Sequence, residues 1–456
     1  MQFGSSMRTT RNTSGASFVD SACWMICAAL ILTIVCPSAD AQTAVKRPLS
    51  IKQAIQLALN ENPLRRAASL SVSERRQEKD VARSALLPQA TLIAAQGVKS
   101  FNMQNIIGGP NPTRIGPFQS IDVGPATSIT LFNLPLLRRY QASREDVRTA
   151  VSQESATREQ ITAIVVARYF IALRATANRE AAAARVQLAQ RLYDQAAHLQ
   201  KTGVGTEIDV LRAQVELQNE KQRLIDADAQ HNSAIYALGQ VLDLPVGQEP
   251  ELTDVMEFYN LRAFSARDLI AEALQDRPEI RALDSAERAA NLRTKAARDQ
   301  RLPTLQISGA VDYQARKPDD GLGAYGYSIG LKVPLWTSGR IKAQEEEAKL
   351  EELKIAEQRR EVESVVEQQV KTALDQLNAA RQAVRVAELG LNLAHQEVER
   401  AQRRFEAGVG TNVEVTTAQD ALARADDNRI EALYRFNQDR ADLARSVGHV
   451  EDVYGK

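Results

Sequence analysis

Residues 203–206 read Gly-Val-Gly-Thr, and residues 408–411 repeat the same four letters. A second matched pair of stretches lies upstream, at residues 49–90 and 264–305. Both upstream stretches carry an Ala-Leu pair shortly before an internal proline, as ALNENP or ALQDRP, and both end just after a Leu-Pro pair. Repetition on this scale predicts a chain built from two structurally equivalent halves.

Each half follows the same order of elements: a short helix, a longer helix, two strand-like segments and a helical hairpin. Proline disfavours helix in the residue before it, so Pro88 and Pro303 mark where the second helix of each half ends. The helices are expected at about 50–60 and 64–87 in the first half, and at about 265–275 and 279–301 in the second.

Two segments after Pro303 alternate apolar residues with polar or small ones, which is the period of a strand with one apolar face. The first half shows a vaguer version of the same alternation. Strands are expected at about 90–101, 121–132, 304–315 and 324–336, with loops at about 102–120 and 316–323.

Long helices are predicted for most of the remaining chain. Proline is absent from Leu136 to Leu244 and again after Leu335, so each half is expected to hold a helix of about 65–70 residues, roughly 100 Å long. Between Val366 and Phe405, apolar residues and alanines recur at alternating spacings of four and three. This heptad seam predicts coiled-coil packing.

The first 41 residues have the pattern of a secretory signal peptide. Arg8 and Arg11 precede an apolar run at residues 22–35, and Ala39-Asp40-Ala41 supplies the small residues for cleavage after Ala41. The organisation expected is therefore a signal peptide at 1–41, a first repeat at 42–250 and a second repeat at 251–456.

All three cysteines lie inside the predicted signal peptide. The mature chain is therefore expected to have no disulfide and no thiol chemistry. Lipid attachment at Cys36 is the alternative to cleavage after Ala41, although Val35 is a poor fit to the small residue that such a site needs. Met7 is an alternative start to Met1.

Composition narrows the class of protein. The 57 basic and 57 acidic residues balance, which argues against nucleic acid as a main partner. After the signal peptide we find no run of about 18 apolar residues, so a membrane would be crossed by a β-barrel rather than by helices. Four strands are too few to enclose a pore, whereas three chains would supply twelve. A homotrimer is the simplest cyclic closure, although the spacing alone also allows other counts.

These features resemble the TolC-like outer membrane efflux proteins. The resemblance rests on the tandem repeat, on the two Gly-Val-Gly-Thr turns and on the strand-to-helix stretch Val333–Arg340, and it covers about residues 42–450. Leu131–Arg139 departs from the pattern because it lacks the Ser-Gly turn. The resemblance implies a mainly α chain with a β-barrel portion, in which a homotrimer forms a 12-stranded barrel in outer-membrane lipid and an α-helical barrel in the periplasm.

The resemblance also implies a role and partners. The channel would receive substrates from a periplasmic adaptor (membrane fusion) protein, fed by an inner-membrane pump of the RND or ABC type, in efflux or type I secretion. Substrates would leave the cell unchanged, so the protein would not be an enzyme and would need no cofactor. Drugs, metal ions and proteins all remain candidate substrates.

The two repeated turns are the candidate docking site. As local structure they are helical-hairpin turns, in which a glycine just past a helix end tolerates the left-handed backbone. The resemblance adds that they form periplasmic tips that bind the adaptor. The docking residues expected are Gly203, Val204, Gly205 and Thr206 in the first half, and Gly408, Val409, Gly410 and Thr411 in the second.

Four further residues are candidates for a periplasmic gate. Asp209 and Glu414 each follow a turn in the Thr-x-x-acid spacing of a capping box. By resemblance, three copies of each acid would ring the narrow end of the conduit, hold it closed and favour cations. Phe405 matches a family aromatic near the gate, although it also closes the heptad seam. Thr417 replaces an aspartate that the family often has, which implies a weaker or differently built ion network.

Two other classes of protein fit the sequence less well than the channel. A soluble periplasmic coiled-coil scaffold or adaptor has no need of amphipathic hairpins at equivalent repeat positions. An enzyme with a carboxylate metal centre would need Glu-x-x-His pairs, which none of the four histidines has. No histidine spacing predicts zinc, and His231 is expected to be hydrogen-bonded inside its helical seam. The histidines are His198, His231, His395 and His449.

Overall fold

The structure is a computed structural model that describes residues 45–455 apart from 103, 105–107, 109–113, 246, 263, 316, 318 and 408. The predicted signal peptide, with both candidate start residues and Cys36, lies outside the described residues, as does Gly408. The chain divides into two compact units, Met1–Val45 and Lys46–Lys456, and the helices and the four-stranded sheet described below belong to the second unit.

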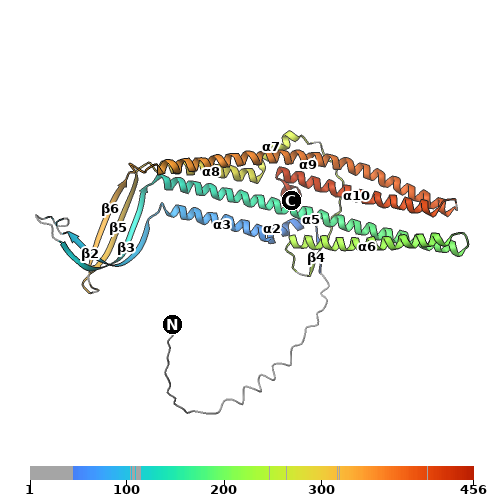
Figure 1. The fold of residues 1–456 in the computed structure, drawn as a ribbon, viewed down its shortest axis with the longest axis horizontal. Coiled ribbons are helices and arrows are strands. Elements are labelled where there is room, and N and C mark those ends of the chain that lie inside the picture. The colour runs from blue at the N-terminus through green and yellow to red at the C-terminus, as the bar shows by residue number, and fades with distance from the viewer. Residues whose placement is uncertain are drawn as a thin grey trace, which may run out of the picture. The chain divides into compact units, whose positions relative to one another are not determined.

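The two halves contain nearly the same elements (Figure 1). The first half comprises β1 (Val45–Leu49), α2 (Ile51–Glu61), α3 (Pro63–Ser84), β2 (Gln89–Asn102), β3 (Arg114–Phe132), α5 (Leu134–Lys201) and α6 (Glu207–Val241). The second comprises β4 (Gln248–Leu252), α7 (Ala266–Asp276), α8 (Pro278–Asp299), β5 (Thr304–Ala315), β6 (Leu322–Lys332), α9 (Arg340–Glu406), α10 (Asn412–Val447) and the short α11 (Val450–Tyr454). Matched helices have matched lengths: α3 and α8 have 22 residues each, and α5 and α9 have 68 and 67. The tandem repeat with long helices is thus confirmed.

Local sequence signals account for several helix boundaries. The Ser50 hydroxyl accepts a hydrogen bond from the Gln53 N–H at 3.3 Å, and the Gln53 side chain accepts one from the Ser50 N–H at 3.0 Å. This capping box starts α2. Pro63 and Pro278 occupy the first turns of α3 and α8, where the missing N–H would have no partner in the helix.

The four longer strands form one antiparallel sheet in the order β2-β3-β5-β6. The hairpins of the two halves therefore join through β3 and β5, with Ile129 opposite Ile307. The loop predicted at 102–120 is wrong in its second part, because β3 already begins at Arg114. Gly116-Pro117 indicated a loop from the sequence. In the structure β3 continues to pair with β2 on both sides of a bulge, so this segment belongs to the sheet.

The sheet has one apolar and one polar face. Residues directly opposite each other on paired strands share a face, and the faces alternate along each strand. One face carries Leu92, Val98, Ile121, Val123, Ile307, Val311, Tyr325, Tyr327, Ile329 and Leu331. The other carries Lys99, Ser120, Asp122, Ser128, Gln306, Ser308, Ala310, Gly326 and Ser328. The apolar face is uncovered in the single chain, where Tyr325 and Tyr327 are 82% and 81% exposed.

The long helices pack as two antiparallel pairs, α5 with α6 and α9 with α10, and α5 also contacts α10. The seam predicted on α9 is buried, including Val366, Leu377 and Val398. The largest apolar cluster surrounds the middle of α5, where Tyr169 is fully buried among residues of α2, α6, α10 and α11. This core holds the two halves together.

One helix in the described ranges is long and apolar enough to cross a membrane by length and composition alone. It is α5, which contains an 18-residue window of mean hydropathy 1.2, a run that was not expected from the sequence. Half of the window is buried inside the protein. Because α5 contributes Ile161, Val165 and Val166 to the core, its role in the core accounts for the apolar composition.

Candidate functional site

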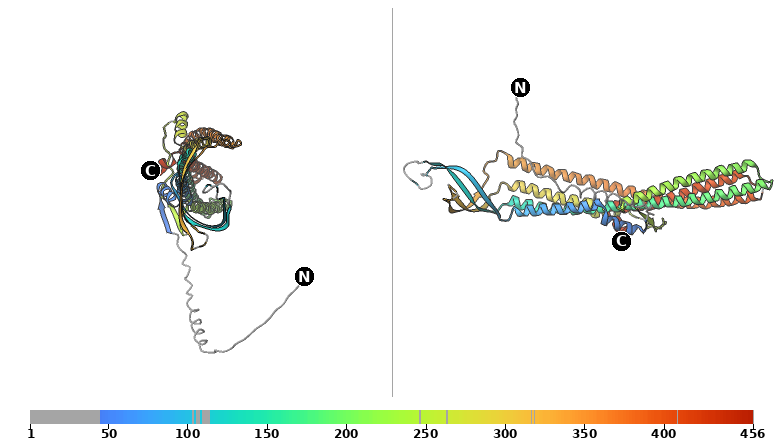
Figure 2. Two further views of the ribbon diagram at one scale, coloured as in Figure 1. Left: turned by 90° about the vertical axis from the view of Figure 1, so that its left-hand side faces the viewer. Right: turned by 90° about the horizontal axis from the view of Figure 1, so that it is seen from below.

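Both Gly-Val-Gly-Thr turns lie at one end of the helical region, and the four-stranded sheet lies at the other end (Figures 1 and 2). The first tip, residues 203–206, joins α5 to α6, and the second tip, residues 408–411, joins α9 to α10. Folding therefore brings the two repeated motifs, far apart in sequence, to the same end of the long helices.

The first tip is a glycine-dependent helix ending. The N–H groups of Val204 and Gly205 both donate to the carbonyl oxygen of Leu199 at 3.0 Å, and Gly203 has a φ of +77°. Glycine adopts this left-handed conformation without the steric penalty of other residues. A Cβ on Gly205 would lie 3.0 Å from the backbone nitrogen of Gln200. The turn leaves the Val204 side chain 74% exposed.

The second tip reproduces this hydrogen-bond pattern. The N–H groups of Val409 and Gly410 donate to the carbonyl oxygen of Arg404 at 3.0 and 2.9 Å. A Cβ on Gly410 would lie 3.0 Å from the carbonyl carbon of Arg404, while Gly408 lies outside the described residues. Val409 is 68% exposed, so each tip presents one valine to solvent.

The acids that follow the two turns have different partners. The Asp209 carboxylate accepts hydrogen bonds from the N–H and the hydroxyl of Thr206, at 3.3 and 2.5 Å. At the second tip, the Thr411 hydroxyl accepts one from the Glu414 N–H at 3.3 Å, but the Glu414 carboxylate lies 3.3 Å from the Nε atom of Arg404. The capping box expected at Glu414 is therefore only half formed, because an arginine on the other arm of the hairpin takes its carboxylate.

Phe405 packs into the seam between α9 and α10. It is partly buried against a cluster that Leu192 of α5 also contacts, and the cluster consists of Val398, Ala401, Val415 and Ala418. Thr417 is exposed and lines a shallow groove between α9 and α10 with Arg404 and Glu414. The structure thus brings Arg404, Glu414 and Thr417 together at one groove, whereas Phe405 packs against the apolar cluster.

Several apolar residues near the tips were not singled out from the sequence. On α6, Ile208, Leu211 and Val215 are each more than half exposed, and so are Leu389 and Leu393 on α9. Their spacing of three and four places each set on one helix face. Both helices already have an apolar seam on the face that packs inside the chain. A second set of apolar residues at helical spacing on another face indicates a second contact surface, and this pattern is visible in the sequence.

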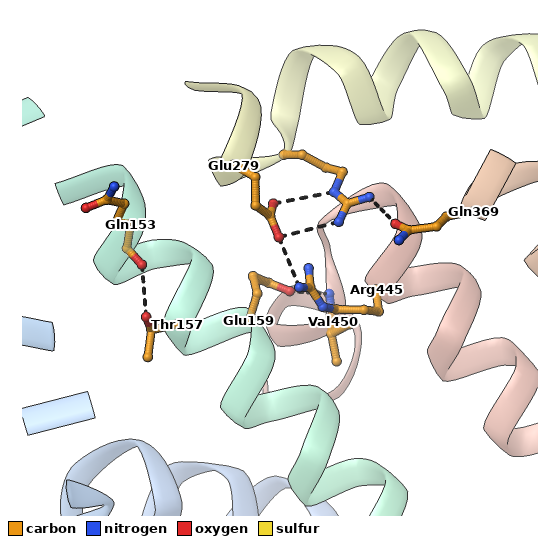
Figure 3. Close-up of polar contacts among 8 residues, drawn as sticks. Gln153, Thr157, Glu159, Glu279, Gln369, Arg445 and Val450 are labelled. Atoms are coloured by element: carbon orange, nitrogen blue, oxygen red, sulfur yellow. Dashed lines mark hydrogen bonds and ion pairs between the residues drawn. The ribbon is translucent and has the colours of Figure 1, made fainter. Parts of the chain in front are cut away.

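A polar network, the repeat-junction network, connects α8, α9 and α10 of the second half away from the tips (Figure 3). Arg277, between α7 and α8, is 6% exposed; it lies 3.4 Å from Glu279 and donates to Gln369 on α9 at 2.6 Å. Arg445 on α10 donates to Glu279 at 3.0 Å. Burial disfavours the charged form of Glu279, but the two arginines outweigh burial and hold its pKa below the usual value.

Glu159 of α5 extends the repeat-junction network to the end of the chain (Figure 3). Its carboxylate accepts a hydrogen bond from the Val450 N–H at 3.0 Å, at the start of α11. Burial raises the pKa of Glu159, and the backbone hydrogen bonds partly oppose this shift. A residue of the first half therefore holds the last helix of the second half.

His231 is less buried than its seam position predicted. It is partly exposed on α6, and its Nδ1 lies 3.3 Å from Oδ1 of the neighbouring Asn232. The expectation of an interior histidine is therefore wrong. Among the described long helices of the single chain, α6 packs mainly against α5, which leaves His231 on a flank that is only partly covered.

The model of the outer membrane efflux protein family matches residues 54–242 and 269–449 of the chain. Among curated proteins, outer membrane protein TolC of Vibrio cholerae is 24% identical over 381 residues, which cover 81% of this chain and 84% of the relative. Alkaline protease secretion protein AprF of Pseudomonas aeruginosa is 24% identical, covering 89% and 85%. Toluene efflux pump outer membrane protein TtgF of Pseudomonas putida is 26% identical, covering 82% and 78%.

Solved structures show the same fold. The CmeC outer membrane channel of Campylobacter jejuni superposes with a TM-score of 0.73 at 16% identity, covering 88% of this chain and 86% of that chain. The open state of the Neisseria gonorrhoeae MtrE outer membrane channel gives 0.69 at 20% identity, covering 89% and 90%. Together with the two-faced sheet, the family match and the curated relatives favour a channel over a soluble coiled-coil scaffold. The chain belongs to the outer membrane efflux protein family and is an outer-membrane transport channel of the TolC type.

Proposed function

We propose that three copies of the chain assemble into a duct that spans the outer membrane and extends into the periplasm. Strands β2 and β6 stand at the two ends of the sheet order, each with one unpaired edge in the single chain. Unpaired backbone groups are not tolerated in lipid. Pairing β6 of one copy with β2 of the next satisfies both edges, and three copies close a twelve-stranded barrel. The apolar face then contacts lipid and the polar face lines the lumen.

The helices support the same cyclic arrangement. Because α5 contacts α10, helices α6 and α9 lie at the two sides of the chain's helical layer. Both carry exposed apolar residues, among them Ile208 and Leu211 on α6 and Leu389 on α9. A soluble surface rarely leaves such stripes uncovered. Neighbouring copies would cover them and close the helices into a cylinder.

The two tips are proposed to bind a periplasmic adaptor protein that connects the duct to an inner-membrane pump of the RND or ABC type. The observation that carries this proposal is the repeated turn: Val204 and Val409 stand in equivalent hydrogen-bonded turns, at the end opposite the sheet, and both are largely exposed. The relatives include a protease secretion protein and a toluene efflux pump protein, so the proposal covers type I secretion and small-molecule efflux.

Asp209, Glu414, Phe405 and Thr417 are proposed to form the periplasmic gate. Asp209 and Glu414 have different partners, so the contacts that hold these two acids in place differ in strength between the two tips. Asp209 is held by a local capping box, whereas Glu414 is held by an exposed ion pair with Arg404. Exposed ion pairs contribute little and are screened by salt. The second tip is therefore the one expected to move first when the duct opens.

The docking proposal can be tested by site-specific crosslinking. Val204→Cys and Val409→Cys, made separately, introduce a thiol on each tip, since the native cysteines all lie within the first 36 residues. In cells that express the cognate adaptor, a short bifunctional reagent should link either variant to the adaptor. Leu350→Cys is the matched control, because Leu350 is 65% exposed near the sheet end of α9. Equal linkage at Leu350, or none at the tips while export continues, would refute docking at the tips.

A further inference from the structure

We propose that Glu272, Asp276 and His449 form a binding site for a divalent transition-metal ion, for which zinc is the best match. Oε1 of Glu272 and Oδ2 of Asp276 lie 3.2 and 3.5 Å from Nε2 of His449. One ligand atom from each residue lies within 4.8 Å of the other two. Carboxylate oxygen and imidazole nitrogen are among the ligands that zinc takes in proteins.

The spacing of these atoms matches a tetrahedral ion. Zinc bonds to nitrogen and oxygen are about 2.0–2.1 Å long, so two ligand atoms of a tetrahedral site lie about 3.3 Å apart. The two nitrogen–oxygen separations of 3.2 and 3.5 Å bracket this value. Three protein ligands would leave the fourth position to water.

The two negative charges of Glu272 and Asp276 on α7 favour the binding of a cation between them. Glu272 and Asp276 are one turn apart, so like charges share one helix face and repel each other. They also lie in the last turns of α7, where the helix dipole disfavours negative charge. Two neighbouring arginines have other partners: Arg277 contacts Glu279 and Gln369, and Arg281 donates to the backbone oxygen of Asp276 at 2.6 Å rather than to its carboxylate.

The position of His449 is set by its own surroundings. Gly448 ends α10 with a φ of +94°, and the His449 N–H donates to the carbonyl oxygen of Ala444 at 2.9 Å. Nδ1 of His449 lies 3.3 Å from Oδ2 of Asp452. A carboxylate on one ring nitrogen favours a proton there and leaves the other nitrogen free to bind a metal. Within the described residues, Nε2 makes no hydrogen bond and has no solvent contact.

A metal here would tie the first helix of the second half to the last residues of the chain. Glu272 and Asp276 come from α7, His449 follows α10, and Asp452 lies on α11. The site lies next to the repeat-junction network, since Gly448 packs against Arg277. The sequence does not reveal the site because its ligands come from segments far apart in the chain, whereas a spacing motif detects only ligands that lie close together in sequence.

Isothermal titration calorimetry with zinc chloride tests the site, using the full chain purified in detergent and stripped with EDTA. We expect one saturable ion per chain, and at least tenfold weaker binding in His449→Gln and in the double variant Glu272→Gln/Asp276→Asn. Asp452→Asn, which removes the outer partner, should weaken binding by about 10–100-fold. The control His231→Gln, which removes an unrelated histidine on α6, should leave the affinity unchanged.

Equal affinity in the wild type, His449→Gln and His231→Gln would overturn the proposal. X-ray absorption gives a second readout, since the zinc-loaded protein should show nitrogen and oxygen ligands at about 2.0 Å with imidazole scattering that His449→Gln lacks. If His449→Gln does not fold, the double variant carries the test, because Glu272 and Asp276 are more exposed than the histidine. A melting temperature that depends on pH but not on zinc would mean that a proton fills this role, which also overturns the proposal.

Discussion

Ser328 and Ile329 are neighbours in β6, yet their side chains lie on opposite faces of the sheet. Ser328 is opposite Ser308, with the two hydroxyl oxygens 2.8 Å apart on the polar face. Ile329 is opposite Ile307 on the apolar face and is 67% exposed. One step along the strand therefore separates the side proposed to face lipid from the side proposed to face the lumen.

Ile329→Arg is expected to destabilise the assembled barrel by up to about 2–4 kcal/mol, because it places a charge on the lipid face. Ser328→Arg should assemble as the wild type does and alter only the conductance of the channel. The heat-modified mobility of the outer-membrane fraction reports assembly, and planar-bilayer recording reports conductance. Equal loss of assembly in both variants would contradict the assignment of the two faces.

Gly205→Ala and Gly410→Ala are each expected to destabilise their hairpin by about 1 kcal/mol, because the added methyl must displace backbone atoms 3.0 Å away. Gly390→Ala is the matched control on α9, where a Cβ meets no atom within 4 Å among the described residues. Gly390 is partly exposed, and alanine in place of a helical glycine without close contacts should raise stability by about 0.5–1 kcal/mol. Hydrogen–deuterium exchange around each position measures both changes, and faster exchange in the Gly390 variant would count against this account.

Glu159→Ala should cost about 1–3 kcal/mol, because it leaves the fully buried Val450 N–H without its acceptor. Glu159→Gln keeps an acceptor oxygen and should cost less. Thermal denaturation in detergent gives the stability, and limited proteolysis at the C-terminus reports whether α11 has come loose. Protection of α11 in the alanine variant would show that the hydrogen bond does not hold this helix.

Asp439 on α10 should make stability depend on pH. Burial first, and then the nearby Asp442 charge, raise the pKa of Asp439 from 3.8 to about 6, against the opposing charge of Arg435. A carboxyl with a raised folded-state pKa binds its proton more tightly in the folded protein. Its contribution therefore favours folding at low pH and is lost as pH rises through about 6.

Asp439→Asn removes this penalty, so its melting temperature should exceed that of the wild type at pH 7.5 and match it near pH 4. The full shift would correspond to roughly 3 kcal/mol, but Asp439 is partly exposed and solvent screens its charge. The expected gain at the higher pH is therefore about 1 kcal/mol. Asp420→Asn elsewhere on α10 is the control. Identical pH profiles for both variants would show that Asp439 does not cause the dependence.

The sequence predicted the features that depend on local patterns. Pro63 and Pro278 begin α3 and α8, and the spacing from Val366 onward predicted the buried seam of α9, because caps, prolines and heptads act within a few turns. The strand start at Arg114 was missed because pairing with β2 overrides the local preference of Gly116-Pro117 for a loop.

The candidate site was predictable to the same degree. The glycine turns were expected from their four letters, and their shared hydrogen bonds followed. The ion pair between Arg404 and Glu414 was not expected, because it depends on how the two helices of the hairpin pack against each other. The contact of Arg445 with Glu279 was missed for the same reason: tertiary packing brings Arg445 of α10 to Arg277 and Glu279, which are neighbours at the start of α8.

The near-equal lengths of the paired hairpins restrict how this architecture can change. Inserting one residue in α5 would advance its tip by about 1.5 Å and rotate it by about 100°, which turns the seam away from its partner. An insertion of seven residues restores the contact face, whereas three or four residues must be absorbed by local overwinding or unwinding of the coil. Because α6, α9 and α10 would need the same addition for both tips to stay level, a longer or shorter duct requires coordinated changes in four helices, and neither repeat can change its reach alone.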